Sequence, residues 1–406
     1  MPAHQNSADR PLRIAMISVH TDPYGEAGTG DVGGMNIVIR ETAAQLAAAG
    51  HSVDVFTRRS AHGQPQVRTP NERLRVIALT AGPEHPLSKG EHETVVPAFA
   101  EALHDYSGYD VVHAHHWYSG LAAEQWAQDA RAAFLQSFHS IAAPVDSPLD
   151  AGERPEVPAR LEAERHLARS ADAVITVSRA ERDTVVKRLG APAEHVIVVH
   201  PGVDITRFHP RDASASLTPR ELVAAARIEP LKGIDLAIEA LALVPENERP
   251  DLTVAGGESS QADGELARLQ ALAARRGIAR HVHFVGALGR TELAARMRDA
   301  LAVVVPSHSE TFGLCALEAS ASGVPVIAAA AGGLGEAVLD GTTGQLLHTR
   351  RPADWASAIT RLIEHPADAA RQGAAGRAHA ETQTWQRSAD ALAAAYRTVI
   401  DRRIES

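Results

Sequence analysis

The chain has 406 residues, 45% of them hydrophobic, so it is too long for one ordinary core and suggests two or three domains. Its net charge of −10 argues against a general nucleic-acid role, and its single cysteine, Cys315, excludes an internal disulfide and fits a reducing compartment. No apolar run reaches the roughly 18–20 residues of a membrane span, and residues 1–10 lack a signal-peptide core, so we expect a cytoplasmic protein without membrane insertion.

The first half of the chain alternates between strand and helix patterns. The apolar run Leu12–Val19 predicts a buried parallel strand, and Met35–Ala49 predicts a helix that ends at Gly50. Between them lies a glycine-rich loop with Gly33 and Gly34, where the backbone can approach a phosphate or a sugar closely. Further strands are predicted at 52–57, 75–79, 111–114, 134–137, 173–177 and 196–199.

The same pattern restarts after a linker-like segment, 205–220, that is rich in Pro, Ser and Asp. Strands are predicted at 222–226, 252–255, 282–285, 301–305 and 324–328, with helices near 234–243, 265–276 and 292–299. We therefore expect an α/β protein with two doubly wound, Rossmann-like domains, 1–208 and 209–384, and a ligand cleft between them. The last segment, 385–406, is predicted to be a helix that closes the second domain or crosses back to the first.

The segment from Val305 to Glu318 carries the clearest functional pattern. It predicts a strand, a loop that holds Glu310, and a helix that begins near Phe312, Gly313 and Leu314. The unpaired N–H groups at the start of a helix favour an anion, and the carboxylates of Glu310 and Glu318 suit sugar hydroxyls. This favours a nucleotide-sugar site, and the alternative is a buried turn with Glu318 on a solvated helix face.

Basic and imidazole side chains also follow predicted strands. Arg227 and Lys232 come after the first strand of the second domain, where two cations would stabilise the charge of a departing pyrophosphate; as an alternative they are surface charges. The run of histidines at 113, 115 and 116 lacks an established metal-ligand spacing, so lining of the cleft is favoured over a metal site or a plain loop. His139 is another candidate for the cleft or for a structural role.

Three other function classes stay open on these residues alone. Asp54 lies about 20 residues after the glycines, as in NAD-dependent oxidoreductases, although a full G-x-G-x-x-G pattern is missing. Glu310 and Glu318 could instead be the acid and the nucleophile of a glycoside hydrolase. A nucleotide-binding protein without catalytic activity is the third alternative.

Taken together, the chain resembles the retaining glycosyltransferases of family 4, which have the GT-B fold, over nearly its whole length. The motifs that carry the resemblance are Gly-Gly-Met-Asn at 33–36, His-x-His at 113–115, His-Pro-Gly-Val-Asp at 200–204, Arg227 with Lys232, and the glutamates at 310 and 318.

The resemblance implies sugar transfer from a nucleoside diphosphate sugar to a small polar acceptor. The resemblance favours UDP-GlcNAc as the donor, with UDP preferred over GDP, and an inositol phosphate as the acceptor. It implies that the anomeric configuration is retained and that neither a tightly bound cofactor nor a metal is required. A homodimer is one option that the family raises. The implied donor contacts are Gly33 and Gly34 on the phosphates, His139 near the reacting carbon, Arg227 and Lys232 on the pyrophosphate, Glu310 with the backbone of Phe312, Gly313 and Leu314 on the sugar hydroxyls, and Glu318 on the ribose.

The acceptor positions match this family less well. Thr29, Asn36, Lys89 and Arg160 stand where acceptor contacts are expected. However, His116 replaces an expected Tyr, Ser140 replaces a Thr, and Val145-Asp146 replaces a Lys-Asn pair. An acid at Asp146 would suit an acceptor with positive charge, such as an aminocyclitol or a betaine, and Trp117 and Tyr118 could add cation–π contacts. An enzyme of an antibiotic pathway is therefore the alternative within the family.

Overall fold

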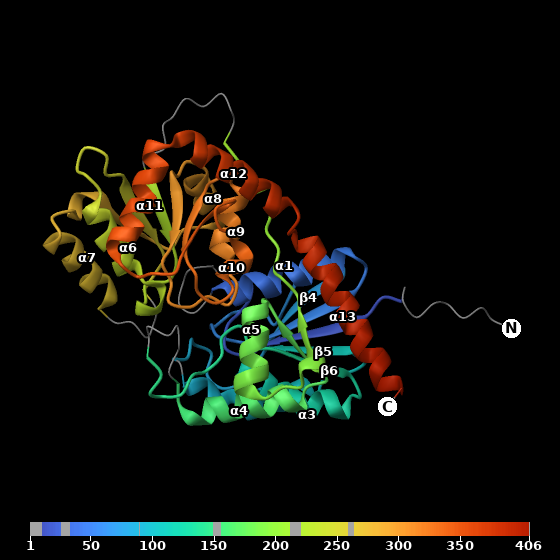
Figure 1. The fold of residues 1–406 in the computed structure, drawn as a ribbon. Helices are drawn as coiled ribbons and strands as arrows, with labels where there is room; N and C mark the ends of the chain where they lie inside the picture. The colour runs from blue at the N-terminus through green and yellow to red at the C-terminus, as the bar shows by residue number, and fades with distance from the viewer. Residues whose placement is uncertain are drawn as a thin grey trace.

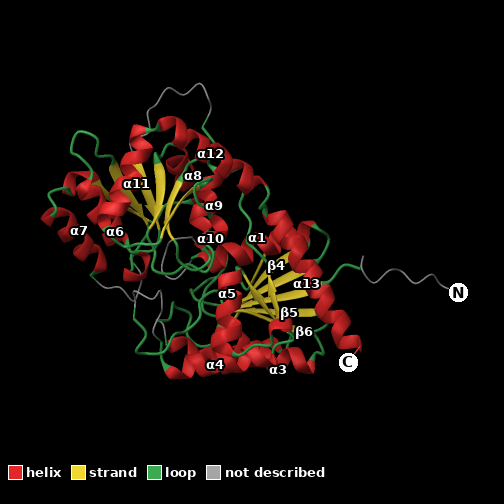
Figure 2. Cartoon of the chain, in the orientation of Figure 1, coloured by secondary structure: helices red, strands yellow, loops and turns green. Residues whose placement is uncertain are grey.

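The computed structural model describes residues 10–25, 33–88, 90–148, 156–211, 221–258 and 264–405. Two parallel sheets, each covered by helices on both faces, form two lobes (Figures 1 and 2). The predicted pair of doubly wound domains is thus confirmed. Two of the predicted acceptor contacts, Thr29 and Lys89, lie outside the described residues.

The first sheet has eight strands in the order β3-β4-β2-β1-β5-β6-β7-β8. All neighbouring pairs are parallel except β3 and β4. The strands are β1 Arg13–Ser18, β2 Ser52–Arg58, β3 Val67–Asn71, β4 Leu74–Leu79, β5 Val111–His115, β6 Ala133–Ser137, β7 Ala173–Thr176 and β8 Val196–Val198. The helices of this lobe are α1 Gly34–Ala48, α2 Val96–Leu103, α3 Trp117–Asp129, α4 Pro158–Ser170 and α5 Arg179–Thr184.

The second sheet has six strands in the order β11-β10-β9-β12-β13-β14, and all of its pairs are parallel. The strands are β9 Glu221–Ala225, β10 Asp251–Ala255, β11 Val282–Gly286, β12 Ala302–Val305, β13 Val326–Ala329 and β14 Gly344–Leu347. The later helices are α6 Ile234–Leu243, α7 Glu265–Arg275, α8 Arg290–Arg298, α9 Leu314–Ala321, α10 Leu334–Ala337, α11 Pro352–Glu364, α12 Pro366–Glu381 and α13 Trp385–Glu405.

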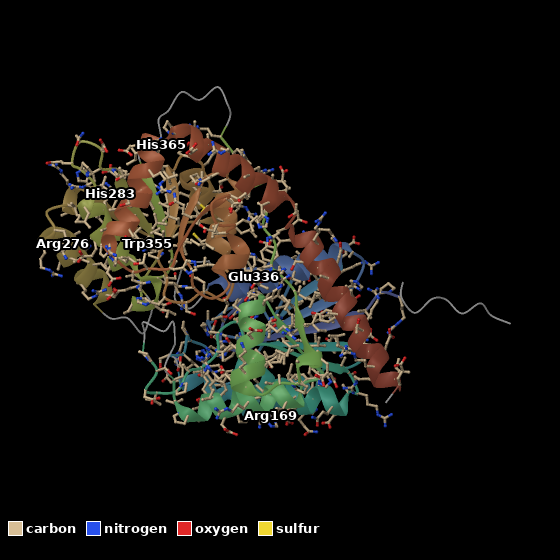
Figure 3. All side chains as sticks on the ribbon, in the orientation of Figure 1. Arg169, Arg276, His283, Glu336, Trp355 and His365 are labelled. Atoms are coloured by element: carbon tan, nitrogen blue, oxygen red, sulfur yellow. The ribbon has the colours of Figure 1, made fainter. Side chains whose placement is uncertain are left out.

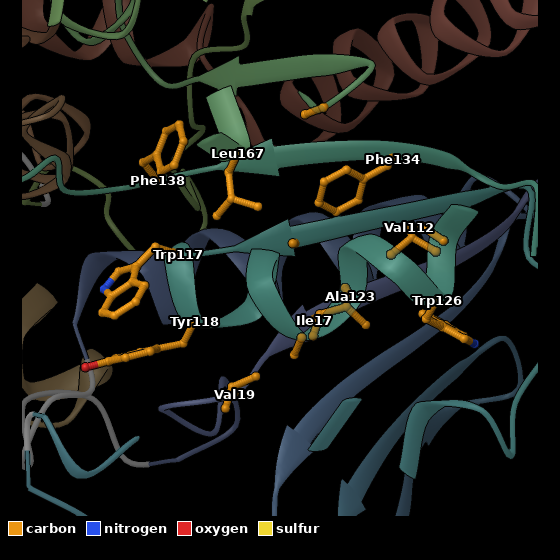
Figure 4. Packing of buried hydrophobic residues seen from close by; sticks show 14 of the residues in the cluster. Ile17, Val19, Val112, Trp117, Tyr118, Ala123, Trp126, Phe134, Phe138 and Leu167 are labelled. Atoms are coloured by element: carbon orange, nitrogen blue, oxygen red, sulfur yellow. The ribbon is translucent and has the colours of Figure 1, made fainter. Parts of the chain in front are cut away.

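Apolar side chains fill the space between each sheet and its helices. In the first lobe, α2, α3 and α4 cover one face of the sheet, while α1 and α13 cover the other. Figure 4 shows the first of these layers, with Trp117 and Tyr118 at the beginning of α3 and Trp126 near its end. In the second lobe, α6, α7 and α11 cover one face, and α8, α9 and α10 cover the other. These two cores hold the strands in place, and with them the carboxyl ends of the strands from which the functional loops begin.

The chain passes between the lobes at two adjacent places. Val203 N donates a hydrogen bond to Gln383 O (2.9 Å), and a Cβ on Gly202 would lie 2.2 Å from Trp385 N. After this second crossing, α13 packs on the first sheet beside α1 (Figure 1). Phe208 is fully buried in the core of the second lobe. The boundaries at 208/209 and 384/385 themselves remain predictions.

Two strands were not predicted from the sequence. β3 is mostly exposed, contains Pro70 and lies at an edge, where a proline is tolerated because its missing N–H is not needed by a neighbour. β14 is a short edge strand with only its first residue, Gly344, fully buried. Within the described residues, no helix is long and apolar enough to span a membrane.

Candidate active site

A cleft of about 850 Å³ lies between the lobes, at the carboxyl ends of strands from both sheets. Doubly wound sheets bind ligands at this edge because the loops that follow their strands converge there. Most of the residues that the sequence analysis selected line this cleft: Gly33, Gly34, Asn36, His116, His139, Ser140, Arg160, Arg227, Lys232, Glu310, Phe312, Gly313, Leu314 and Glu318.

Two helices begin at this cleft from opposite lobes. α1 starts at Gly34 and α9 starts at Leu314, and a Cβ on Gly34 would contact Leu314 Cδ1 at 3.5 Å. Gly313, the residue before α9, has φ 106°, a conformation that favours glycine. The first N–H groups of a helix lack intrahelical acceptors and carry a partial positive charge. The two helix starts therefore create a place for an anion between the lobes.

Lys232 and Glu310 lie on two neighbouring loops that are in direct contact. Lys232 Nζ is 2.7 Å from Glu310 Oε1, which also accepts a hydrogen bond from Ser307 Oγ (2.9 Å). Gly233 has φ 62°, and a Cβ there would lie 2.2 Å from Pro306 O, so only glycine allows this approach. Lys232 ends a 3-10 turn, and α6 begins at Ile234 after the glycine.

Glu318 is buried in the second turn of α9, where it forms an ion pair with Arg290 at 2.5 Å. Arg290 opens α8, lines the cleft and lies 4.8 Å from the centre of the Phe208 ring. The sequence analysis did not select Arg290. Its position at the start of α8, where a cation is unfavourable without an anion nearby, is the signal that could have identified it.

The second lobe makes its part of the cleft rich in cations. Arg227 is 3.3 Å from Glu229, and Arg350 donates a hydrogen bond to Pro306 O at 2.9 Å. In the described part of this lobe, the cleft lining includes four basic side chains, Arg227, Lys232, Arg290 and Arg350, and two carboxylates, Glu310 and Glu318, while Glu229 beside Arg227 adds a third carboxylate. This excess of positive charge suits a diphosphate.

His139 and His116 have strained backbones at the ends of neighbouring strands. Their φ values are 59° and 73°, and Arg131 is the only other non-glycine residue with a positive φ among the described residues. Such strain concentrates at functional sites, because the surrounding structure must hold it in place. The loops after β5 and β6 therefore place two imidazoles in the cleft by imposing unusual backbone conformations.

The imidazole of His139 is stacked on that of His115, and a 2.9 Å hydrogen bond joins His139 Nε2 to His115 Nδ1. Only Nδ1 of His139 is thus left to contact a ligand. Burial lowers the pKa of His139 to about 4. Burial, with a smaller contribution from His113, holds the pKa of His115 well below its usual value. Both rings are neutral at pH 7, so His139 can exchange hydrogen bonds with a sugar without adding charge.

Imidazole and aromatic rings dominate the first lobe's part of the cleft. His20 and His116 have ring centres 4.1 Å apart, and Tyr118 lies 5.0 Å from His116 and 5.6 Å from His92. Burial, with a contribution from His92, lowers the pKa of His20 to about 3. His20 and His92 were not selected from the sequence. His20 does follow the first predicted strand directly, which is the signal that could have identified it.

The guanidinium of Arg160 is almost entirely buried and already has several partners. It donates to Glu164 (2.8 Å), to Glu156 (3.0 Å), and to both the carbonyl oxygen and the hydroxyl of Ser140 (2.9 and 3.0 Å). Its side chain is 3% exposed. Arg160 and Ser140 are therefore brought together at the cleft, but two carboxylates already balance the charge of Arg160.

Asn36 serves partly as a structural residue. Its amide nitrogen donates to Thr21 Oγ1 (2.9 Å) and to the carbonyl oxygen of Asp22 (3.1 Å), and its amide oxygen accepts from Gly33 N (3.1 Å). Asn36 thus closes the first turn of α1. Because it also lines the cleft, a ligand would contact a residue whose orientation is already fixed.

The lining of the cleft does not include Asp146, Asp54 or His113. Asp146 is exposed and is absent from the lining of the cleft, so its acceptor role stays a prediction. Asp54 pairs with Arg75 through two hydrogen bonds (2.7 and 2.6 Å) and accepts another from Tyr109 (2.6 Å). His113 likewise points away from the cleft, toward Tyr396 and Ser137. Across the described residues, no group of three or more His, Cys, Asp or Glu side chains could hold a metal ion.

Comparisons with known proteins cover the whole chain. Residues 206–379 match the family described as "Glycosyl transferases group 1", and residues 33–202 match the "Glycosyl transferase 4-like domain". The D-inositol 3-phosphate glycosyltransferase of Mycolicibacterium gilvum is 37% identical over 424 aligned positions, which cover 100% of this chain and 94% of the relative. The protein of the same name from Mycobacterium tuberculosis (strain H37Ra) is 38% identical, with coverage of 98% and 86%.

Solved structures show the same architecture. A sucrose-phosphate synthase from Thermosynechococcus elongatus superposes with a TM-score of 0.87 at 31% identity, over 96% of this chain and all of the other. The Anabaena protein HepE, solved with UDP-glucose, has a TM-score of 0.73 at 20% identity, over 97% of this chain and 100% of its own. At that identity the likeness to HepE concerns the fold alone.

Proposed function

The chain belongs to the group 1 glycosyltransferases with the GT-B fold, and on this basis we propose that it transfers a sugar from a nucleoside diphosphate to a small polar acceptor with retention of configuration. The proposed donor is UDP-GlcNAc and the proposed acceptor is an inositol phosphate. Relatives that align over nearly the whole chain carry the name D-inositol 3-phosphate glycosyltransferase, which supports this acceptor.

One observation carries the donor part of the proposal. The starts of α1 and α9 meet in the cleft beside Arg227 and Lys232. Backbone N–H groups and fixed cations at one point suit the diphosphate of a nucleotide sugar. Glu310 and Glu318, on either side of the start of α9, would then hold hydroxyls of the sugar and of the ribose. UDP is proposed over GDP, and a protein of the same fold has been solved with UDP-glucose.

The proposed reaction exchanges one bond to the anomeric carbon for another. The bond from this carbon to the phosphate oxygen breaks, and the acceptor hydroxyl forms a new bond on the same face of the sugar. The departing phosphate oxygen takes the proton of that hydroxyl, so UDP leaves with the bonding electron pair. Arg227 and Lys232 would stabilise the growing negative charge on the diphosphate. Neutral His139 would orient a sugar hydroxyl through Nδ1.

A cationic or zwitterionic acceptor is the second candidate, and the surroundings of Arg160 favour it. A phosphate bound at Arg160 would lie near the carboxylates of Glu156 and Glu164, which already accept from its guanidinium. The rings of His20, His116 and Tyr118 provide apolar, electron-rich faces close by. Such faces suit an aminocyclitol or a betaine.

The deciding experiment is a transfer assay with paired donors and acceptors. UDP-GlcNAc and a GDP-sugar would each be incubated with an inositol phosphate, unphosphorylated inositol, an aminocyclitol and a betaine. The release of nucleoside diphosphate and the anomeric NMR signal of the product would be recorded. An α-linked inositol phosphate product supports the first proposal. Products from the cationic acceptors alone support the second, and release of free sugar in every mixture would contradict both.

A further inference from the structure

Two short helices, one from each lobe, lie next to each other at the junction between the lobes. α5 follows β7 of the first sheet, and α10 follows β13 of the second. Figure 1 shows α10 next to the upper end of α5, and Figure 3 places Glu336 of α10 at this junction. Glu336 Oε1 accepts hydrogen bonds from Arg179 N (2.8 Å) and Ala180 N (3.3 Å), and its Oε2 lies 2.8 Å from His200 Nε2.

These contacts complete the cap of α5. The first N–H groups of a helix have no acceptor within the helix. Ser178 Oγ accepts from Glu181 N (3.0 Å), and Glu336 supplies the acceptor for the two preceding N–H groups. A carboxylate at this end also interacts favourably with the helix dipole. Because Glu336 belongs to the other lobe, the cap is complete only when the lobes adopt this relative arrangement.

On the second lobe, α10 is fixed to the loop that carries Glu310. Gly333 N donates a hydrogen bond to Glu310 O at 2.8 Å. Gly332 has φ 53°, and a Cβ there would lie 2.1 Å from the same oxygen, so the close approach requires glycine. A change in the position of Glu336 therefore accompanies a change in the loop that is proposed to hold the donor sugar.

On the first lobe, α5 lies next to the backbone of His139. Glu181 lies in the first turn of α5 and is buried, and its Oε2 accepts a hydrogen bond from Val177 N at 2.7 Å. The main chain of His139 lies next to this carboxyl group, although Glu181 Oε1 accepts no hydrogen bond from the described residues. His139 has the strained φ of 59°, which needs such support. A shift of α5 would therefore move the Glu181 carboxyl group that lies next to the His139 backbone.

We propose that Glu336 is a positioning residue that couples the arrangement of the lobes to the active site. By capping α5 from the second lobe, it holds His139 opposite Lys232 and Glu310. The catalytic part of this inference rests on the proposed function, since it assumes that His139 and Lys232 act on one donor. The mechanical part, a cap that links the two lobes, does not depend on the reaction.

The test compares Glu336→Ala with Glu336→Gln and with Glu292→Ala. Alanine removes the cap, whereas glutamine keeps an oxygen that can accept from Arg179 N and Ala180 N. Glu292 is an exposed carboxylate in the first turn of α8 in the same lobe and serves as the matched control. Each variant would be measured for UDP affinity, for kcat and KM, and for the distance between fluorophores attached to the two lobes.

Removal of the cap should lower kcat about tenfold, because even a small misplacement of His139 relative to the donor slows the reaction. UDP affinity should stay within about threefold, because most of the proposed nucleotide contacts, Arg227, Lys232 and Glu318, are on the second lobe. The distance distribution between the lobes should broaden. Glu336→Gln should restore most of kcat and a narrow distribution, and Glu292→Ala should match the wild type. Retention of UDP binding would show that the variants are folded.

Two outcomes would overturn the inference. In the first, Glu336→Ala leaves both kcat and the distance distribution unchanged. In the second, both Glu336 variants lose UDP affinity together with kcat, which would mean that Glu336 only supports the donor loop. If the wild type transfers no sugar to any acceptor, the proposed function fails by itself, and the distance distributions of the three variants still decide whether the cap links the lobes.

Discussion

Lys232 Nζ lies 2.7 Å from Glu310 Oε1, although the two residues are separated by 78 positions in the sequence. The side chains are 16% and 19% exposed, so this ion pair is largely shielded from solvent. Each residue is therefore the partner of the other while the donor is absent. If Lys232 binds a diphosphate and Glu310 binds a sugar, donor binding must exchange this contact for contacts with the ligand. The consequences of changing either residue are then linked.

Lys232→Ala should lower kcat/KM by about 10²–10³-fold, because a fixed cation that stabilises the leaving diphosphate is lost. It should also reduce the thermal stabilisation that UDP provides. Lys187→Ala is the matched control, since Lys187 is 76% exposed and lies on the first lobe. Equal activity of the Lys232 variant and this control would remove Lys232 from the proposed mechanism.

The double variant Glu310→Gln, Lys232→Ala should lose less kcat/KM, on a logarithmic scale, than the sum of the losses of the two single variants. Residues in direct contact are coupled, because the first change already breaks the interaction that the second would break. The measurement is a double-mutant cycle on kcat/KM with UDP-GlcNAc. Strict additivity of the two logarithmic losses would show that the ion pair has no part in turnover.

The periodic pattern of the sequence predicted most strands, because continuous apolar runs have few alternatives in a buried parallel sheet. Edge strands such as β3 lack that signal, since exposed residues and Pro70 are as common in loops. Many residues that line the cleft could be predicted because they follow strands within short segments. Arg160 shows the limit of such predictions. Its partner Glu164 is one turn along α4 and its partner Glu156 lies just before the helix, whereas its contact with Ser140 depends on tertiary packing.

Contacts between the lobes could not be predicted from the sequence. Glu336 and Arg179 are 157 residues apart, and neither lies in a motif that points to the other. The cap forms because the two crossings at Gly202 and Trp385 set the relative position of the sheets. Local patterns contain no information about such a position, which arises only from the packing of complete domains.

The protein should lose stability steadily as the pH falls from 6.5 toward 4. Burial lowers the pKa of His20 and His113 to about 3 and that of His139 to about 4, so these rings stay neutral when folded. Below pH 6.5 the unfolded chain binds protons that the folded chain does not, and each such histidine costs about 1.4 kcal/mol per pH unit. Denaturant unfolding at pH 7 and pH 5 would measure this difference.

Glu181 acts in the opposite direction, because burial raises its pKa to about 7. The folded chain then keeps a proton between pH 4.5 and 7 that the unfolded chain loses, so this carboxyl favours the folded state at the acidic end of that window. Several histidines outweigh one glutamate, and the net change should still be a loss on acidification. His20→Gln should make the loss smaller. Equal stability of the wild type at both pH values would contradict the assignment of neutral buried imidazoles.

Tyr396→Phe should destabilise the first lobe by about 1–3 kcal/mol, although Tyr396 belongs to the C-terminal helix. Tyr396 is fully buried, and a 2.8 Å hydrogen bond joins its hydroxyl to His113 Nδ1, while His113 Nε2 lies 3.0 Å from Ser137 Oγ. Removal of the hydroxyl leaves this nitrogen of a buried imidazole without that partner. Thr398→Ala, an exposed change on the same helix, should alter the free energy of unfolding by less than about 0.5 kcal/mol.

The same variant separates a structural role of α13 from a catalytic one. Tyr396 packs on the face of the first sheet that α1 and α13 cover, and its partner His113 points away from the cleft. UDP affinity should therefore match the wild type at a temperature where both proteins are folded. Denaturant unfolding followed by UDP titration would test both parts, and a change below 0.5 kcal/mol in stability would show that the helix does not depend on this hydrogen bond.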